Sequence, residues 1–124
     1  MCLICDRIQQ IKNGTNPYFV KELEPAFKAR FLEEMSLAAE AAYHAFGAEK
    51  MNYELLGNGD THLHWHLFPR KKGDLEEYGN HGKGPVWWYP MEKMYDDANR
   101  PTQKELEEMK TALRKELDKL VKKG

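Results

Sequence analysis

The stretch His62-Leu63-His64-Trp65-His66-Leu67-Phe68-Pro69-Arg70 sets three histidines in alternation with apolar residues. Successive side chains of a β-strand point to opposite faces, so the histidines are expected to share one face while Leu63, Trp65 and Leu67 point into a core. Neighbouring histidines of such a strand lie about 6.6 Å apart at Cα, and the outer two about 13 Å apart. This spacing suits a ligand extended along the strand better than one metal ion held by all three.

Imidazole is a suitable group for a ligand that contains phosphate. Histidine has a pKa of about 6.5, so its neutral form is present and nucleophilic at neutral pH. A phosphorylated histidine stays labile enough to hydrolyse. Neighbouring histidines can donate hydrogen bonds to phosphate oxygens as charge develops. The alternative is that the three histidines only face solvent from a half-buried strand, but their strict alternation directly after a turn favours a functional site.

A small antiparallel sheet is predicted around the histidine strand. Residues 51–56 and 61–68 alternate as strands. The run Gly57-Asn58-Gly59-Asp60 between them is a strong hairpin signal. Residues 18–23 are expected to form a further short strand.

Helices are predicted before and after this hairpin. Apolar residues recur at helical spacing from Leu3 to Ile11, from Phe27 to Phe46 and from Leu106 to Leu120. Pro25 suits the first turn of the second helix, and a Thr102-x-x-Glu105 capping box precedes the apolar stripe of the third. We therefore expect a single α+β domain over the whole chain, residues 1–124, with helices packed on one face of the sheet.

Composition limits the class of function. The 19 Lys and Arg residues are balanced by 20 Asp and Glu residues, which argues against a protein dominated by contacts with a nucleic-acid backbone. No apolar run approaches the roughly 20 residues that a membrane helix needs, and the N-terminus has no signal-peptide pattern, so we expect a cytoplasmic protein with no membrane partner. A chain of 124 residues is also small enough to gain much from a partner subunit.

The run from His62 to Arg70 resembles the histidine-triad (HIT) superfamily, including the Pro-Arg that commonly follows the triad. The resemblance implies a nucleotide phosphohydrolase or nucleotidyl-transfer enzyme for purine nucleotide derivatives, such as dinucleoside polyphosphates or phosphoramidates. It further implies that His64 attacks the α-phosphorus, that His66 holds phosphate oxygens, and that His62 orients the site or binds a structural metal. Asn58 stands where family members place a polar residue that contacts the nucleotide phosphate.

An aromatic segment lies within residues 71–100, which have no clean period and indicate an ordered loop. By the same resemblance, Trp87 and Trp88 match a C-terminal aromatic segment that lies near a neighbouring active site in family dimers. We therefore assign these two tryptophans to substrate binding. Packing in a core or at an interface is an equally good interpretation of them.

The cysteine pair Cys2-Leu3-Ile4-Cys5 resembles the zinc-containing branch of the family. There, the first triad histidine, here His62, and a histidine from the middle of the chain complete the four ligands that structural zinc prefers. His44 lies on an expected helix and is a poor match for the mid-chain ligand, and His81 has no counterpart in the family pattern. A reduced, packed pair of cysteines is the alternative to zinc.

The resemblance is interrupted before the helix that begins at Pro25. Family members have a β-hairpin and a further strand here, which supply most of the pocket for base and ribose, whereas residues 19–24 run almost directly into the helix. Either natural shortening or loss of a segment from the sequence accounts for the difference. The alternative function is therefore a non-catalytic nucleotide- or metal-binding protein with an incomplete base pocket.

A shortened sheet also has consequences for assembly. Exposed strand edges tend to recruit a strand from another chain, and two-fold contacts or exchange of elements satisfy such edges at low cost. We therefore expect a homodimer, with element exchange as one form of it. The stripe from Phe27 to Phe46 and the edges at residues 18–23 and 51–56 are the expected contacts.

Overall fold

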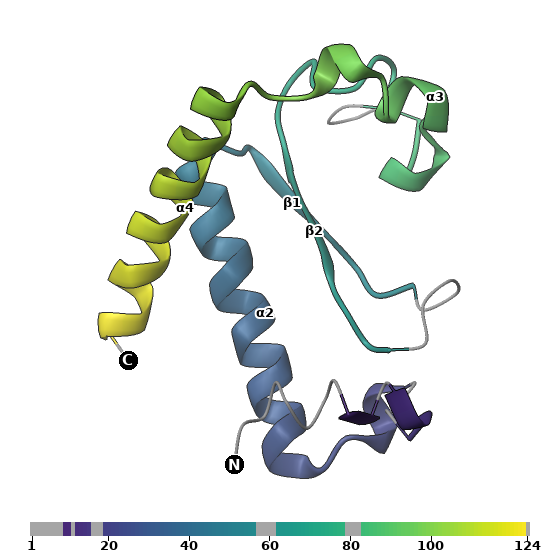
Figure 1. The fold of residues 1–124 in the computed structure, drawn as a ribbon, viewed down its shortest axis with the longest axis vertical. Helices are drawn as coiled ribbons and strands as arrows, with labels where there is room; N and C mark the ends of the chain where they lie inside the picture. Colours follow the sequence, from purple (N-terminus) through teal and green to yellow (C-terminus); the bar gives the residue numbers. More distant parts are fainter. Residues whose placement is uncertain (1–8, 11, 16–18, 57–61, 79–82, 124) are drawn as a thin grey trace. The chain divides into compact units, whose positions relative to one another are not determined.

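The computed structural model describes residues 9–10, 12–15, 19–56, 62–78 and 83–123 (Figure 1). The elements within these residues are the helices α2 (Pro25–Ala45), α3 (Met91–Met94) and α4 (Gln103–Lys123), the strands β1 (Lys50–Glu54) and β2 (His66–Arg70), and the short 3-10 turns η1 (Val20–Glu22), η2 (Val86–Trp88) and η3 (Asp97–Asn99). This composition confirms the α+β fold class.

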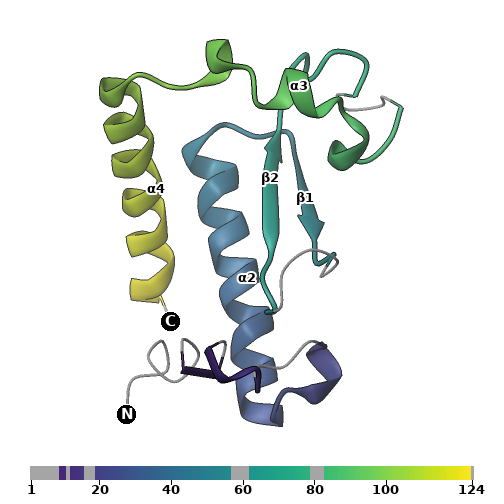
Figure 2. The ribbon, with the colours of Figure 1, turned by 45° about the vertical axis from the view of Figure 1, so that its right-hand side comes forward.

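The two strands pair as a small antiparallel sheet (Figure 2). Just before β1, the N–H of Glu49 donates to the carbonyl of Arg70 at 2.9 Å, so the start of β1 lies opposite the end of β2. Both strands of the expected hairpin are confirmed. Their bounds were wrong, because β1 ends at Glu54 and β2 begins only at His66. No third strand among the described residues pairs with β1 or β2, and an isolated two-stranded sheet is only marginally stable.

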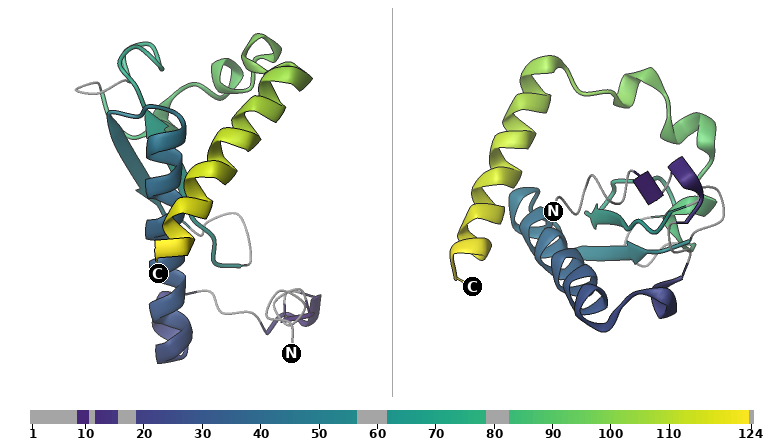
Figure 3. Two further views of the ribbon diagram at one scale, coloured as in Figure 1. Left: turned by 90° about the vertical axis from the view of Figure 1, so that its left-hand side faces the viewer. Right: turned by 60° about the horizontal axis from the view of Figure 1, so that its bottom comes forward.

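Helix α2 ends, and helix α4 begins, where the sequence predicts. Gly47 follows α2 with φ of +60°, a left-handed conformation that glycine adopts without a side-chain penalty. At the start of α4, which runs unbroken (Figure 3), the Glu105 N–H donates to Thr102 Oγ1 at 3.2 Å. In return the Thr102 N–H donates to Glu105 Oε2 at 2.8 Å. The capping box is therefore confirmed. Of the helix expected from Leu3 to Ile11, only residues 9 and 10 are described, and they are helical, as are residues 12 and 13 beyond it.

The strand expected at residues 18–23 is wrong over its described part. Within η1 the Glu22 N–H donates to the carbonyl of Phe19 at 2.9 Å, and the Phe19 N–H donates to the Glu22 carboxylate at 3.1 Å. These bonds satisfy backbone groups inside one turn, so the segment needs no partner strand. The described residues of this segment therefore offer no strand edge, and both the dimer contact expected here and the homodimer itself stay predictions.

The chain divides into two compact units, which we describe separately. The first contains described residues of 1–35 and 53–67, and the second contains described residues of 36–52 and 68–124. The buried apolar side chains are mostly small: Leu23, Ala39, Ala41, Ala42, Ala48 and Val86. No described side chain of large volume is fully buried, and no residue of α4 is buried. None of the described helices has the length and apolar character needed to cross a membrane.

Candidate functional site

The three triad histidines lie in a row in the first unit. The ring centroids of His62 and His64 are 4.9 Å apart, and those of His64 and His66 are 4.8 Å apart. The rings of His62 and His64 are half-buried, and that of His66 is exposed. The histidines therefore share one face as expected, although only His66 belongs to the regular strand.

A backbone contact determines which nitrogen of His64 carries the proton. Nδ1 of His64 lies 3.1 Å from the carbonyl oxygen of His62. Because a carbonyl oxygen can only accept, this hydrogen bond requires a proton on Nδ1. In the neutral imidazole the lone pair is then on Nε2. The backbone of His62 thus leaves Nε2 as the unprotonated nitrogen of the neutral His64 ring.

Trp65 lies between the histidines in sequence and contacts a helix. Its ring centroid is 5.6 Å from that of Phe31, on the part of α2 that belongs to the same unit. This contact fits the expectation that residues between the histidines point toward packed apolar side chains. The indole Nε1 is buried and has no hydrogen-bond partner among the described residues. A buried donor without an acceptor lowers stability by about 1–3 kcal/mol.

Arg70, at the far end of the same sequence stretch, is a buried anchor in the second unit. Its exposed fraction is 5%. Its guanidinium donates two hydrogen bonds to Asp74, with Nε–Oδ2 and Nη2–Oδ1 distances of 2.8 and 3.1 Å. Nη1 donates to Asn52 Oδ1 at 2.9 Å, and Nη2 also donates to the carbonyl of Tyr78. Sequence reasoning noted this arginine as part of the motif but assigned it no role. The position of Arg70 directly after Pro69 in the motif was the sequence signal that could have indicated a role for it.

Hydrogen bonds keep Asp74 charged within this cluster. Partial burial works to raise the pKa of its carboxyl, but hydrogen bonds from the Arg70 side chain and from the N–H groups of Lys71 and Leu75 outweigh that effect. The pKa of Asp74 is therefore lowered from its ordinary value. The ionised form of Asp74 is the one that holds the segment after β2 against Arg70.

The expected metal ligands fall largely outside the described residues. Cys2 and Cys5 lie there, and so do His81 and the phosphate-binding candidate Asn58. In the part of the chain that the structure describes, no group of three or more His, Cys, Asp or Glu residues is arranged to hold a metal ion. The zinc site that joins Cys2 and Cys5 to His62 stays a prediction.

His44 is described, and its surroundings are those of a surface residue. It lies on α2 with half of its side chain exposed, and its Nε2 is 3.8 Å from Glu40 Oε1 one turn earlier. Its ring also meets that of Tyr43 edge-on at 5.2 Å between centroids. These contacts give His44 an environment typical of an exposed helix face.

Trp87 and Trp88 form an exposed pair in η2. Their ring centroids are 5.6 Å apart at 81°, and the residues are 56% and 54% exposed. Gly84 is needed for this arrangement, because a Cβ on it would lie 2.7 Å from Cε3 of Trp88. The tryptophans belong to the second unit and the triad to the first, so their contribution to substrate binding stays a prediction.

Histidine triad proteins are among the solved structures that resemble this chain. No protein-family model matches the chain, and no curated protein matches its sequence. A histidine triad (HIT) protein from Sinorhizobium meliloti 1021 has a TM-score of 0.62 at 29% identity, over 80% of this chain and 65% of that one. A histidine triad protein from Marinobacter aquaeolei VT8 has a TM-score of 0.58 at 27% identity, over 86% and 69%. The chain thus spans about two thirds of the length of both relatives, and their similarity confirms the resemblance.

Proposed function

Because this chain is related to the histidine-triad superfamily, we propose that it binds a purine nucleotide derivative along its triad and cleaves it through a nucleotidyl-histidine intermediate. The substrate class is that of dinucleoside polyphosphates and nucleoside phosphoramidates. The observation that carries the proposal is the row of three imidazole rings in which the His62 carbonyl orients His64. A row of this kind matches a ligand whose phosphates extend along it.

The first chemical step uses the lone pair on Nε2 of His64. It attacks the α-phosphorus, a P–N bond forms, and the bond from phosphorus to the leaving group breaks, with the electron pair going to the leaving group. Positive charge develops on the imidazole during this step, and the His62 carbonyl that accepts from Nδ1 stabilises it. In this proposal His66, which is exposed, donates to phosphate oxygens.

The second step regenerates the enzyme. Water attacks the same phosphorus, the P–N bond to His64 breaks, and the electron pair returns to Nε2. The product is a nucleoside monophosphate, and the proton lost by water is left in solution. Splitting one difficult displacement into two easier ones is the general advantage of such covalent catalysis.

The test is a single-turnover comparison of histidine variants. His64→Ala should abolish release of nucleoside monophosphate while the fold is retained, because the half-buried imidazole adds little to the apolar core. His62→Ala and His66→Ala should be milder at the chemical step. His44→Ala, a histidine removed from the exposed face of α2, is the matched control and should keep the wild-type rate.

Two measurements decide the outcome of this comparison. Mass spectrometry of the acid-sensitive adduct should place the nucleotidyl group on a peptide containing His64 in the wild type and detect none in His64→Ala. A His64→Ala variant that turns over at the wild-type rate would show the covalent mechanism to be wrong.

A second candidate function is supported by the length of the relatives. The chain covers only 65% and 69% of them, so a part of each has no counterpart here. If that part completes the pocket for base and ribose, the triad binds a nucleotide or a metal without turnover. Saturable nucleotide binding with no nucleoside monophosphate released from any generic substrate would favour this alternative.

A further inference from the structure

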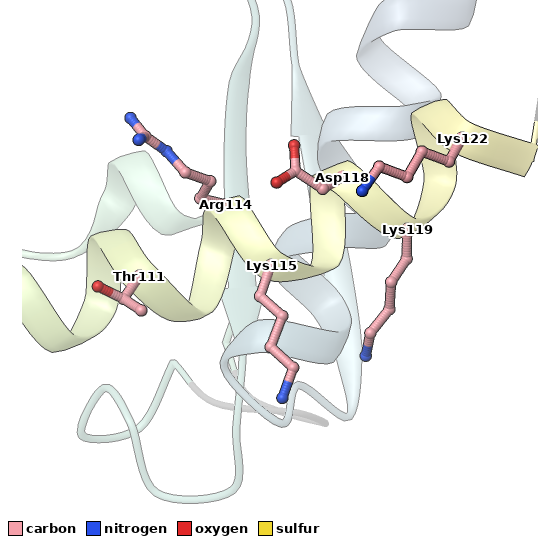
Figure 4. Close-up of a pocket in the computed structure, with 6 residues that line it drawn as sticks. All are labelled: Thr111, Arg114, Lys115, Asp118, Lys119 and Lys122. Atoms are coloured by element: carbon pink, nitrogen blue, oxygen red, sulfur yellow. The ribbon is translucent and has the colours of Figure 1, made fainter.

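Helix α4 carries a basic hollow that the proposed nucleotide chemistry does not use. The hollow has a volume of about 410 Å³, and its lining residues, all from α4, are Thr111, Arg114, Lys115, Asp118, Lys119 and Lys122. Figure 4 shows Lys115 and Lys119 extending in the same direction, with Asp118 placed along the helix between Arg114 and Lys122. The lining contains four cationic groups and one carboxylate, so its net charge is +3 in a chain whose net charge is −1.

The cations of the hollow differ from the lysines earlier on the same helix. Lys110 pairs with Glu107 at 2.9 Å, and Lys104 approaches Glu108 at 3.8 Å. In the hollow, Lys119 pairs with Glu116 at 2.7 Å. No residue that the structure describes forms an ion pair with the other three cations, which are Arg114, Lys115 and Lys122.

This accumulation of positive charge is unfavourable for the isolated helix. Lys119 lies four residues after Lys115 and three before Lys122, and like charges at these spacings destabilise a helix. The helix dipole favours cations, but only in the last turn, which accounts for Lys122. Arg114 and Lys115 lie more than two turns before the end of α4 at Lys123. Asp118 lies four residues after Arg114, three after Lys115 and four before Lys122, which are spacings at which opposite charges attract. This one carboxylate offsets only part of the charge of the three cations, so the face stays basic.

We propose that the hollow binds a small soluble polyanion whose charges lie on linked phosphates, such as a tripolyphosphate group. The lining comes from one exposed face of α4, so a bound anion would remain partly in contact with solvent. Lys115 and Lys122 are separated by about 10 Å along the helix axis, a reach suited to a few linked phosphates and not to a long polymer. The Thr111 hydroxyl adds a neutral donor, and Asp118 weakens the site by opposing the anion.

The experiment follows backbone amide NMR signals of the full chain during titration with sodium tripolyphosphate, and with sodium orthophosphate for comparison. Signals of residues 111–122 should shift with tripolyphosphate at concentrations where orthophosphate has little effect. The double variant Lys115→Gln/Lys122→Gln should bind about tenfold more weakly, because it removes two exposed charge contacts. The double variant Lys104→Gln/Lys110→Gln makes the same charge change on the same helix and should keep the wild-type affinity.

Asp118→Asn gives a prediction of opposite sign. Removing the carboxylate from the hollow should tighten tripolyphosphate binding by about threefold, and added salt should reduce the difference because the charges are exposed. Glutamine and lysine have similar helix propensity, and circular dichroism should show the same helix content in every variant that replaces lysine.

Three results would overturn the proposal. The first is a set of shifts confined to residues 62–66, which would place the anion at the triad alone. The second is an equal loss of affinity in both lysine double variants, which would indicate nonspecific attraction. The third is a single-stranded oligonucleotide that binds through residues 111–122 more tightly than tripolyphosphate, which would make the surface a nucleic-acid interface. His64→Ala should leave these shifts unchanged, so failure of the proposed catalysis and failure of this site are separate results.

Discussion

The two ends of the stretch from His62 to Arg70 use their polar side chains in opposite ways. At the first end, three imidazoles lie side by side, half-buried or exposed, and Nδ1 of His64 contacts the local backbone at the His62 carbonyl. At the second end, one guanidinium is almost fully buried and donates to Asp74, Asn52 and the Tyr78 carbonyl.

In the proposed function, the histidines at the first end carry out the chemistry, and Arg70 at the second end anchors the motif. A nucleophile must remain accessible to its substrate, and its loss should affect rate more than stability. A buried charge contributes only while its partners are in place, and the loss of one partner leaves the other desolvated and uncompensated. Substitutions at the two ends should therefore change different measured quantities, and that expectation can be tested directly.

The largest effect on stability is expected from Arg70→Met. This variant leaves Asp74 with 22% of its side chain exposed and without its main partner, and it leaves the Tyr78 carbonyl and the Asn52 side chain without their donor. The free energy of unfolding should fall by about 1–3 kcal/mol, because Asp74 is exposed enough to regain water but the Tyr78 carbonyl and the Asn52 amide lose a charged donor. Urea unfolding followed by circular dichroism measures the change.

Two controls sharpen this prediction. Arg100→Met removes an arginine from an exposed pair with Asp97, where both side chains are more than three-quarters exposed, and should change stability little. The double variant Arg70→Met/Asp74→Asn removes both charges and should recover part of the loss. If Arg70→Met is no more destabilising than Arg100→Met, the anchor does not contribute as the contacts indicate.

Acid should weaken the same cluster in a defined direction. The pKa of Asp74 is lower in the folded chain than its ordinary value, so its contribution to stability is present above about pH 4 and is lost as pH falls through the folded pKa. The comparison is between the wild type and Asp74→Asn, each unfolded by urea from pH 6 down to pH 2. The wild type should be the more stable near neutral pH, and its advantage should shrink below about pH 4. An advantage that stays constant over this range would show that the charge on Asp74 is not the source of the stabilisation.

The sequence predicted the elements whose signals are local. The apolar stripe of α2, the glycine after it and the Thr102–Glu105 capping box each depend on residues within a few positions, and each is confirmed. The shared face of the histidines was predictable for the same reason, since alternation alone determines it.

The sequence did not predict one local turn, the start of β2 or the contacts of Arg70 with distant residues. The strand expected at residues 18–23 has suitable residue types, but Glu22 bonds back to Phe19 and closes a turn instead. The regular strand begins only at His66, although the alternation of histidines and apolar residues begins at His62. The role of Arg70 depends on Asn52, which precedes it by 18 residues, and on Tyr78, so its place in the motif indicated importance without indicating burial.

The smallest effect is expected in the middle of the stretch, at Trp65, which belongs to neither end. Trp65→Phe keeps an aromatic ring against Phe31 and removes the buried Nε1 donor that has no described acceptor. The smaller ring buries less apolar area, but removal of an unsatisfied donor is favourable, and the two effects oppose each other. The net change in the free energy of unfolding should stay within about 1 kcal/mol.

Phe31→Leu is the matched control for Trp65→Phe, because it breaks the same ring pair and leaves the indole donor in place. It should be the more destabilising of the two, since it loses an aromatic contact worth about 0.5–1.5 kcal/mol with no compensating gain. Circular dichroism is the suitable probe of urea unfolding here, because Trp65→Phe also changes the fluorescence of the chain. A loss above about 2 kcal/mol in Trp65→Phe would mean that the indole N–H is hydrogen-bonded in the folded protein. The acceptor would then have to come from outside the described residues, and the middle of the stretch would be an anchor like Arg70.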